Sequence, residues 1–195
     1  MIDLLIVPCG QLLTMAGGPA PRRGQEMAEL GLIEHGAVGI NAAQGTIEYA
    51  GPADGLDSQE LAPSCPVVDA TGCVVLPGLI DSHTHLVFAG DRADEFYRRS
   101  RGETYQQIAQ SGGGIRATMA ATRAATAEEL FRLAHARLIR LYKNGTTTVE
   151  TKSGYGLDRE SELKQLQVAA RLRESVPGTT RSESRPRTTT TTLVA

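Results

Sequence analysis

The sequence predicts an α/β protein in which a small β-rich region precedes a series of strand–helix units. Residues 1–75 contain short apolar runs separated by glycine, proline and other turn residues, the pattern expected of β-strands. From residue 76 onward strands alternate with segments of helical periodicity, which is typical of βα units and a parallel sheet. We therefore expect two domains, residues 1–75 and residues 76–195.

Composition and charge indicate neither a nucleic-acid partner nor a membrane. The 195 residues include 20 Lys and Arg against 22 Asp and Glu, a net charge of −2. No apolar run approaches the ~20 residues of a membrane span, and the amino-terminal MIDLLIVPCG has no basic region before its apolar run. Cys9, Cys65 and Cys73 are odd in number and lack C-x-x-C spacing, which predicts reduced thiols in a cytoplasmic protein.

Within the first domain, we expect several short strands. Pro8 and Gly10 are expected to divide the first apolar segment into two strands, and Thr71-Gly72 is expected to form a turn in VVDATGCVVLPG. AVGI and TIEYA, joined across NAAQG, predict a hairpin. The predicted strands lie at residues 2–7, 11–15, 37–40, 46–50 and around 67–78.

The clearest helix of the second domain is residues 127–143. Thr126 and Glu129 form a capping-box pattern, and Asn144-Gly145 supplies a left-handed stop. Its apolar residues recur at helical spacing: Leu130, Leu133, Ala134, Leu138 and Leu141.

The remaining elements of this domain follow the same alternation. We expect strands at 76–88 and 146–152 and a helix at 159–174 that buries Leu163, Leu166, Ala170 and Leu172, with shorter helices within 92–110 and at 115–124. Residues 176–187 are rich in Ser, Thr and Arg. Residues 188–195, TTTTTLVA, have the propensity of a strand, although a disordered low-complexity end fits them equally.

Residues 76–88, LPGLIDSHTHLVF, contain the strongest functional signal. In a strand, residues two apart point to the same face, so His83 and His85 can converge on one metal ion, with Asp81 on the same face. A strand that merely contains two polar residues is the alternative, because H-x-H alone is a weak motif.

Several motifs in order resemble a known family. PGLIDSHTH is similar to the first-strand signature of the amidohydrolase superfamily. HTHLVFAGDRADEF, then SGGGI, Thr122-Arg123 and VETKSGYGLD, resemble the imidazolonepropionases, the ring-opening hydrolases of histidine degradation. The resemblance extends from about Ile2 to about Leu172. It implies the amino-terminal part of a TIM-like (β/α)8 metal-dependent hydrolase barrel, truncated at its carboxyl end, preceded by part of a small β-sandwich.

The resemblance also implies roles for particular residues. His83 and His85 would be two ligands of one zinc or iron ion, with a third histidine and an aspartate from later strands. Arg92 would bind the substrate's propionate by a bidentate contact, and Tyr155 would bind substrate and product. The alternatives from residue type alone are a solvated surface arginine and a tyrosine packed at the rim of a loop.

The implied reaction is hydrolysis of 4-imidazolone-5-propanoate to N-formimidoyl-L-glutamate. The alternatives are another amidohydrolase, such as a cyclic-imide hydrolase or heterocycle deaminase, or an inactive fragment. No catalytic acid or base is assigned, and two imidazoles fall short of the three protein ligands usual for catalytic zinc, so we expect residues 1–195 alone to be inactive. The expected partner is a small-molecule substrate, and a homodimer is compatible with the full-length family.

Overall fold

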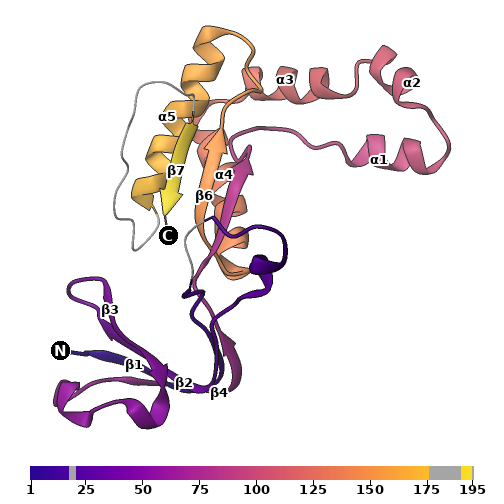
Figure 1. The fold of residues 1–195 in the computed structure, drawn as a ribbon. Helices are drawn as coiled ribbons and strands as arrows, with labels where there is room; N and C mark the ends of the chain where they lie inside the picture. Colours follow the sequence, from indigo (N-terminus) through magenta and orange to yellow (C-terminus); the bar gives the residue numbers. More distant parts are fainter. Residues whose placement is uncertain (18–20, 176–189, 195) are drawn as a thin grey trace. The chain divides into compact units, whose positions relative to one another are not determined.

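The computed structural model describes residues 1–17, 21–175 and 190–194 (Figure 1). The chain separates into two compact units, Met1–Pro77 and Gly78–Ala195. A strand and a disordered end are the alternatives for the carboxyl-terminal tail, of which residues 176–189 and 195 lie outside the described residues. None of the helices in the described part of the chain has the length and apolarity that a membrane crossing requires.

The first unit is a four-stranded sheet in the order β3-β2-β1-β4. Strands β1 and β2, and β2 and β3, pair antiparallel, whereas β4 pairs parallel to β1. The predicted hairpin is therefore confirmed as β2–β3. The strands span Leu4–Leu13 (β1), Leu32–Asn41 (β2), Thr46–Pro52 (β3) and Val67–Val75 (β4), with 3-10 helices at Gly24–Ala28 (η1), Ala53–Gly55 (η2) and Ser58–Glu60 (η3).

The breaks predicted in the first and last strands are wrong. Strand β1 continues through Pro8 and Gly10, because the sheet absorbs them as register shifts between Ile6 and Cys9 and between Cys9 and Gln11. A Cβ on Gly10 would lie 2.9 Å from the carbonyl oxygen of Cys73, so glycine permits the close approach of β4. Strand β4 likewise passes through Thr71-Gly72 without a turn.

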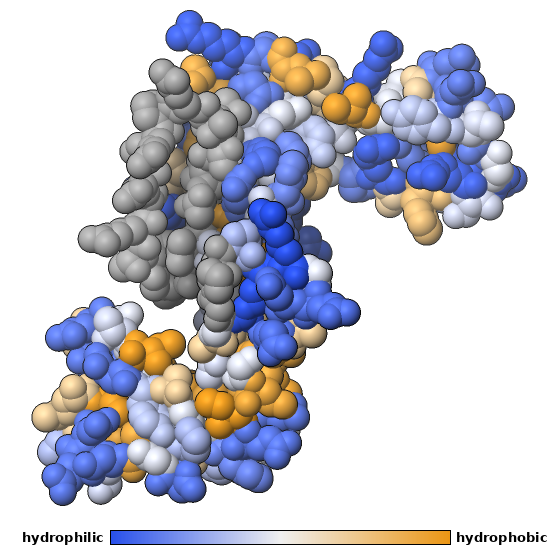
Figure 2. Space-filling view, viewed as in Figure 1, coloured by the Kyte–Doolittle hydropathy of each residue, from blue (hydrophilic) through white to orange (hydrophobic). Residues whose placement is uncertain are grey.

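This sheet buries a small core and exposes many apolar side chains. Cys9, Leu12, Val38 and Ala70 form the buried cluster. Figure 2 shows orange apolar residues on the surface of this unit, and the exposed ones include Leu32, Ile47, Val67, Val68 and Val74.

The second unit is built on a three-stranded sheet in the order β5-β6-β7 (Figure 1). Strands β5 (Leu79–Thr84) and β6 (Thr146–Lys152) are parallel, as predicted, but β7 (Thr190–Val194) pairs antiparallel to β6. The expectation of a wholly parallel sheet is wrong for β7, because strand propensity carries no information about strand direction. The helices are α1 (Ala93–Ser100), α2 (Tyr105–Gln110), α3 (Ile115–Ala124), α4 (Ala127–Lys143) and α5 (Arg159–Ser175).

Helix α4 has the predicted ends and the predicted apolar face. The Thr126 hydroxyl accepts a hydrogen bond from the Glu129 N–H at 3.1 Å, and Gly145 adopts the left-handed conformation at φ +88°. Three residues of the predicted stripe are buried and two are half-buried against the same core: Leu130, Ala134 and Leu138, then Leu133 and Leu141.

Helix α5 buries a different face from the one predicted. Leu163 is 47% exposed and Ala170 is exposed, and of the predicted residues only Leu172 is fully buried. The buried face includes the polar Ser161 and Gln165, followed by Val168, Ala169 and Leu172. The apolar pattern misplaced the face because the face includes polar side chains, of which Gln165 accepts the Tyr155 N–H and donates to the Ser161 carbonyl oxygen.

Replacing Leu130 tests the assigned core between the β5–β6 sheet and helices α4 and α5. Leu130 is fully buried, so in a full-length protein carrying this sequence Leu130→Ala should lower the free energy of unfolding by about 2–5 kcal/mol. Leu163→Ala, on the exposed face of α5, is the matched control and should change it little. Denaturant titration measures both, and equal effects would contradict the assigned core.

Candidate active site

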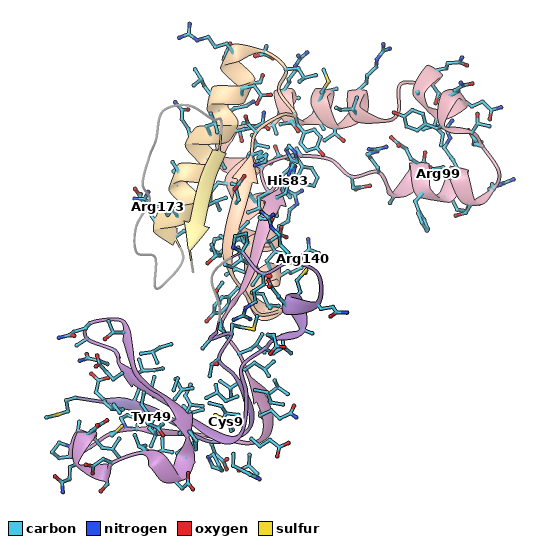
Figure 3. All side chains as sticks on the ribbon, in the orientation of Figure 1. Cys9, Tyr49, His83, Arg99, Arg140 and Arg173 are labelled. Carbon is cyan, nitrogen blue, oxygen red and sulfur yellow. The ribbon has the colours of Figure 1, made fainter. Side chains whose placement is uncertain are left out.

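The two histidines lie at the carboxyl end of β5. Figure 3 labels His83 there, and the ring centroids of His83 and His85 are 5.6 Å apart. His83 is exposed and His85 is half-buried. The Thr84 hydroxyl between them donates to the carbonyl oxygen of Glu150 at 3.0 Å, which ties this end of β5 to β6. The structure therefore brings the two predicted metal ligands together.

Asp81 does not join the two imidazoles, contrary to the expectation from strand alternation. The β5–β6 register shifts between Asp81 and Thr84, so alternation does not run regularly through this stretch. The Asp81 carboxylate accepts the backbone N–H of His83 at 3.2 Å. Within the described residues, no three His, Cys, Asp or Glu side chains are grouped closely enough to hold a metal ion.

Tyr155 contacts His85 from the loop that follows β6. Its ring centroid is 5.2 Å from that of His85 and 5.6 Å from that of Phe88, which sequence reasoning did not single out. Gly154, at φ +140°, allows the approach, because a Cβ there would lie 3.2 Å from the Cε1 of His85. The carboxyl ends of two parallel strands thus meet at this point.

Helix α5 holds the Tyr155 loop through buried and half-buried polar groups. Gln165, 1% exposed, accepts the Tyr155 N–H at 3.3 Å. The Glu162 carboxylate accepts the N–H groups of Gly156 at 2.8 Å and Leu157 at 2.7 Å. The apolar pattern of α5 did not point to these residues, because it predicted a buried face made of apolar side chains. Their signal was a Glu and a Gln three residues apart on the helix directly after the loop.

Arg123 holds the same loop from helix α3. Its Nε donates to the Gly156 carbonyl oxygen at 2.6 Å and lies 3.0 Å from the Asp158 carboxylate. The loop is therefore held from two helices, which limits how far Tyr155 can move from His85.

His85 carries an open ring nitrogen. Its Nδ1 is buried and has no hydrogen-bond partner among the described residues. An unpaired buried polar atom is costly, and imidazole nitrogen is a common ligand of zinc and iron. The donor set at this end of β5 therefore fits a metal ion, with two imidazoles from the described residues.

Arg92 lies in a separate set of contacts. It precedes α1, its Nε donates to Glu95 at 2.8 Å, and among the described residues no contact joins it to the histidine pair. Arg92 also lines a cavity of about 280 Å³ between α1 and α2, with Glu95, Phe96, Arg99, Tyr105 and Ile108. Figure 3 labels Arg99 on α1, apart from His83.

Glu95 links Arg92 to the glycine-rich segment before α3. One carboxylate oxygen binds Arg92, and the other accepts the Gly114 N–H at 2.6 Å. Burial acts to raise the pKa of Glu95, but the hydrogen bonds from Gly114 and Arg92 outweigh it and lower that pKa from its ordinary value. Glu95 therefore stays ionised and holds the Arg92 guanidinium by its Nε side.

Three further polar residues, Lys152, His135 and His35, have ordinary surroundings. Lys152 forms an ion pair with Glu150, in keeping with a structural role. His135 stacks on Phe131 at 5.9 Å within α4, and His35 is exposed on β2.

Comparison with known proteins identifies the class. Residues 66–154, which include both histidines and Gly154, match the Amidohydrolase family model. A triazine hydrolase variant has a similar fold over 86% of this chain and 33% of its own, with a TM-score of 0.52 and 17% identity. The chain has a mixed α/β fold similar to that of this hydrolase, and part of it matches a family of metal-dependent enzymes.

Within that class, the similar sequences are imidazolonepropionases. That of Symbiobacterium thermophilum is 54% identical over 86% of this chain and 39% of its own length. Those of Chloroflexus aggregans and Myxococcus xanthus are 49% and 46% identical over 90% and 91% of this chain, and 40% and 41% of their own. The resemblance recognised from the motifs is confirmed, and the chain spans about two fifths of the length of these relatives.

Glu162 makes the Tyr155 loop sensitive to acid. Burial acts to raise the pKa of Glu162, but hydrogen bonds from Ser153, Leu157, Gly156 and Gly154 outweigh it and lower that pKa. A lowered carboxyl pKa stabilises the fold fully above the ordinary value of about 4.3, and this contribution is lost as the pH falls through the lower, folded value.

We therefore expect the Gly156 and Leu157 amides to lose protection as the pH falls below about 4. In Glu162→Gln these amides should already exchange faster at neutral pH, with a weaker dependence on acid. Hydrogen exchange corrected for intrinsic rates measures this in a full-length protein. Glu160→Gln, exposed on the same turn of α5, is the control, and an equal effect there would refute the role of Glu162.

Proposed function

We propose that this sequence is part of an imidazolonepropionase that hydrolyses 4-imidazolone-5-propanoate to N-formimidoyl-L-glutamate. The observation that carries the proposal is the meeting of His83 and His85 with Tyr155 at the ends of two parallel strands. Identities of 46–54% to imidazolonepropionases over most of this chain support the assignment of the reaction.

We further propose that the two units are pieces of larger domains. The β5–β6 pair with α4 and α5 would begin a (β/α)8 barrel, and the four-stranded sheet would be part of a β-sandwich. Exposed apolar residues at the free edge of β5, Leu79 at 49% and Ile80 at 71%, support a further pairing strand in the complete protein. By the same reasoning, a further part of the complete protein would pack against the exposed valines of β4.

His83 and His85 would hold one zinc or iron ion, together with ligands outside the described residues. The open Nδ1 of His85 and the pairing of the two imidazoles support this role. When bound, such an ion lowers the pKa of water, which makes hydroxide available near neutral pH.

The reaction adds water across one ring bond of the substrate. The water oxygen bonds to the ring carbonyl carbon, and the bond from that carbon to the ring nitrogen breaks. The nitrogen takes up one proton, the second proton goes to solvent, and the carbonyl carbon becomes a carboxylate. Tyr155, beside His85, would position the ring, and its loop has a fixed path because Gln165 and Glu162 hold it.

Arg92 would hold the propionate of the substrate. Glu95 occupies the Nε side of its guanidinium, so the two Nη groups remain for a bidentate contact with a carboxylate. Tyr105 and Arg99 line the same cavity. This role requires the α1–α2 region and the histidine pair to face one substrate in the complete protein.

The metal site is tested by removing its ligands. In a full-length protein carrying this sequence, His83→Ala and His85→Ala should each lower bound zinc or iron and abolish ring opening, because each removes one imidazole donor. Elemental analysis of the purified variants measures the metal. His135→Ala on α4 is the control and should keep it. Full metal occupancy in the His83→Ala/His85→Ala double variant would rule out the assignment.

The proposed contact between Arg92 and the propionate of the substrate is tested by replacing Arg92. Arg92→Ala should raise KM for imidazolone propionate by about one to two decades while metal content stays unchanged, because a charge-assisted contact contributes about 1.5–3 kcal/mol. Arg116→Ala, exposed on α3, should leave KM unchanged. Unchanged kinetics in Arg92→Ala would show that Arg92 binds no substrate. Activity on cytosine or guanine instead of imidazolone propionate would favour a deaminase.

A further inference from the structure

The segment that leaves β5 is irregular and deeply buried. Leu86, Val87 and Ala89 are 2–4% exposed, yet they lie beyond the last residue of the strand, Thr84. Backbone groups in such a segment have no ladder partners and must be satisfied by side chains or water. This segment begins one residue after His85, so whatever holds it also limits the position of that imidazole.

Two buried threonines hold the backbone N–H groups of the segment. The Leu86 N–H donates to the Thr151 hydroxyl and the Ala89 N–H donates to the Thr122 hydroxyl, each at 3.1 Å. Thr151 is 1% exposed and Thr122 is fully buried. Strand β6 and helix α3 therefore each hold one end of the segment.

Arg137 of helix α4 holds the carbonyl groups of the same segment. Its Nη1 donates to the carbonyl oxygen of Leu86 at 2.9 Å and to that of Phe88 at 2.7 Å. The guanidinium carbon also lies 3.6 Å from the centroid of the Phe88 ring. Arg137 thus holds both the backbone and the ring of Phe88. Thr151 and Thr122 bind only the backbone of the segment.

Arg137 is a costly residue for a purely structural role, because its charged side chain is half-buried. Among the described residues no carboxylate lies within ion-pair distance, so two carbonyl groups and an aromatic face balance the charge. Burial, and secondarily Arg140, lower the pKa of the Arg137 guanidinium. An apolar residue at this position would continue the stripe of α4 from Leu130 and Ala134 without that cost.

The contacts continue from Phe88 to the candidate site. The Phe88 ring meets the Tyr155 ring edge-on at 5.6 Å, and the Tyr155 ring lies 5.2 Å from that of His85. We infer that Arg137 is a positioning residue, which fixes Phe88 and through it the relative placement of Tyr155 and His85. The kinetic consequence rests on the proposed function, in which Tyr155 binds the substrate, whereas the placement itself does not.

The structural test uses the metal-free full-length protein. Ring currents of Tyr155 shift the Cε1–H signal of His85, so NMR of histidine-labelled protein reports how the two rings lie. Arg137→Met should move this signal, and Arg140→Met, exposed one turn further along α4, should not. If Arg137→Met fails to fold, Arg137→Lys, which keeps donors but loses the planar stack, should still move it. An unmoved signal in a folded Arg137 variant would overturn the inference.

The kinetic test separates positioning from general destabilisation. Arg137→Met should raise KM for imidazolone propionate about tenfold with metal content retained, and Arg137→Lys should fall between it and the parent protein. Arg137→Met and Phe88→Leu combined should raise KM by less than the product of their separate effects, because both act through Phe88. If the combined variant raised KM by the full product of the two separate effects, or if Arg137→Met left KM unchanged, Arg137 would not act through Phe88. An inactive parent protein would refute the proposed function and leave the NMR result decisive for Arg137.

Discussion

The parallel pairing of β5 with β6 is the constraint on which the candidate site depends. Parallel strands place their carboxyl ends at the same edge of a sheet, so the residues that follow each strand meet there. His85 from one segment and Tyr155 from the other approach to 5.2 Å for this reason, although 70 residues separate them in the chain. Helices α4 and α5 cover the buried face of the pair and supply its core.

That pairing places irregular backbone in a buried position, and polar side chains compensate for it. Thr151, Gln165 and Arg137 each hold backbone groups of a segment that leaves a strand. A buried polar residue is tolerated when its hydrogen bonds are made. The polar residues Ser161 and Gln165 lie inside the buried face of α5, so apolar periodicity misplaced that face, whereas the buried residues of α4 are apolar and were located correctly.

The α1–α2 region is organised by a different buried charge. Glu95 binds Arg92 with one oxygen and the Gly114 N–H with the other, which ties the start of α1 to the start of α3. The result is a cavity with two arginines and a tyrosine in its lining, chemistry suited to an anionic group. In the proposed function, the histidine pair would bind the metal ion and this cavity would bind the carboxylate, on separate parts of one unit.

The sequence by itself determined several local elements and the resemblance to a family. The H-x-H spacing, the Thr126 cap, the stripe from Leu130 and the motifs around Tyr155 are short-range patterns, and each produced a correct element or similarity. Tertiary structure alone decided the register shift that separates Asp81 from the imidazoles, the direction of β7, the polar face of α5 and the contacts of Arg137. These depend on partners distant in the chain, and residue spacing carries no information about which distant group satisfies a buried polar atom.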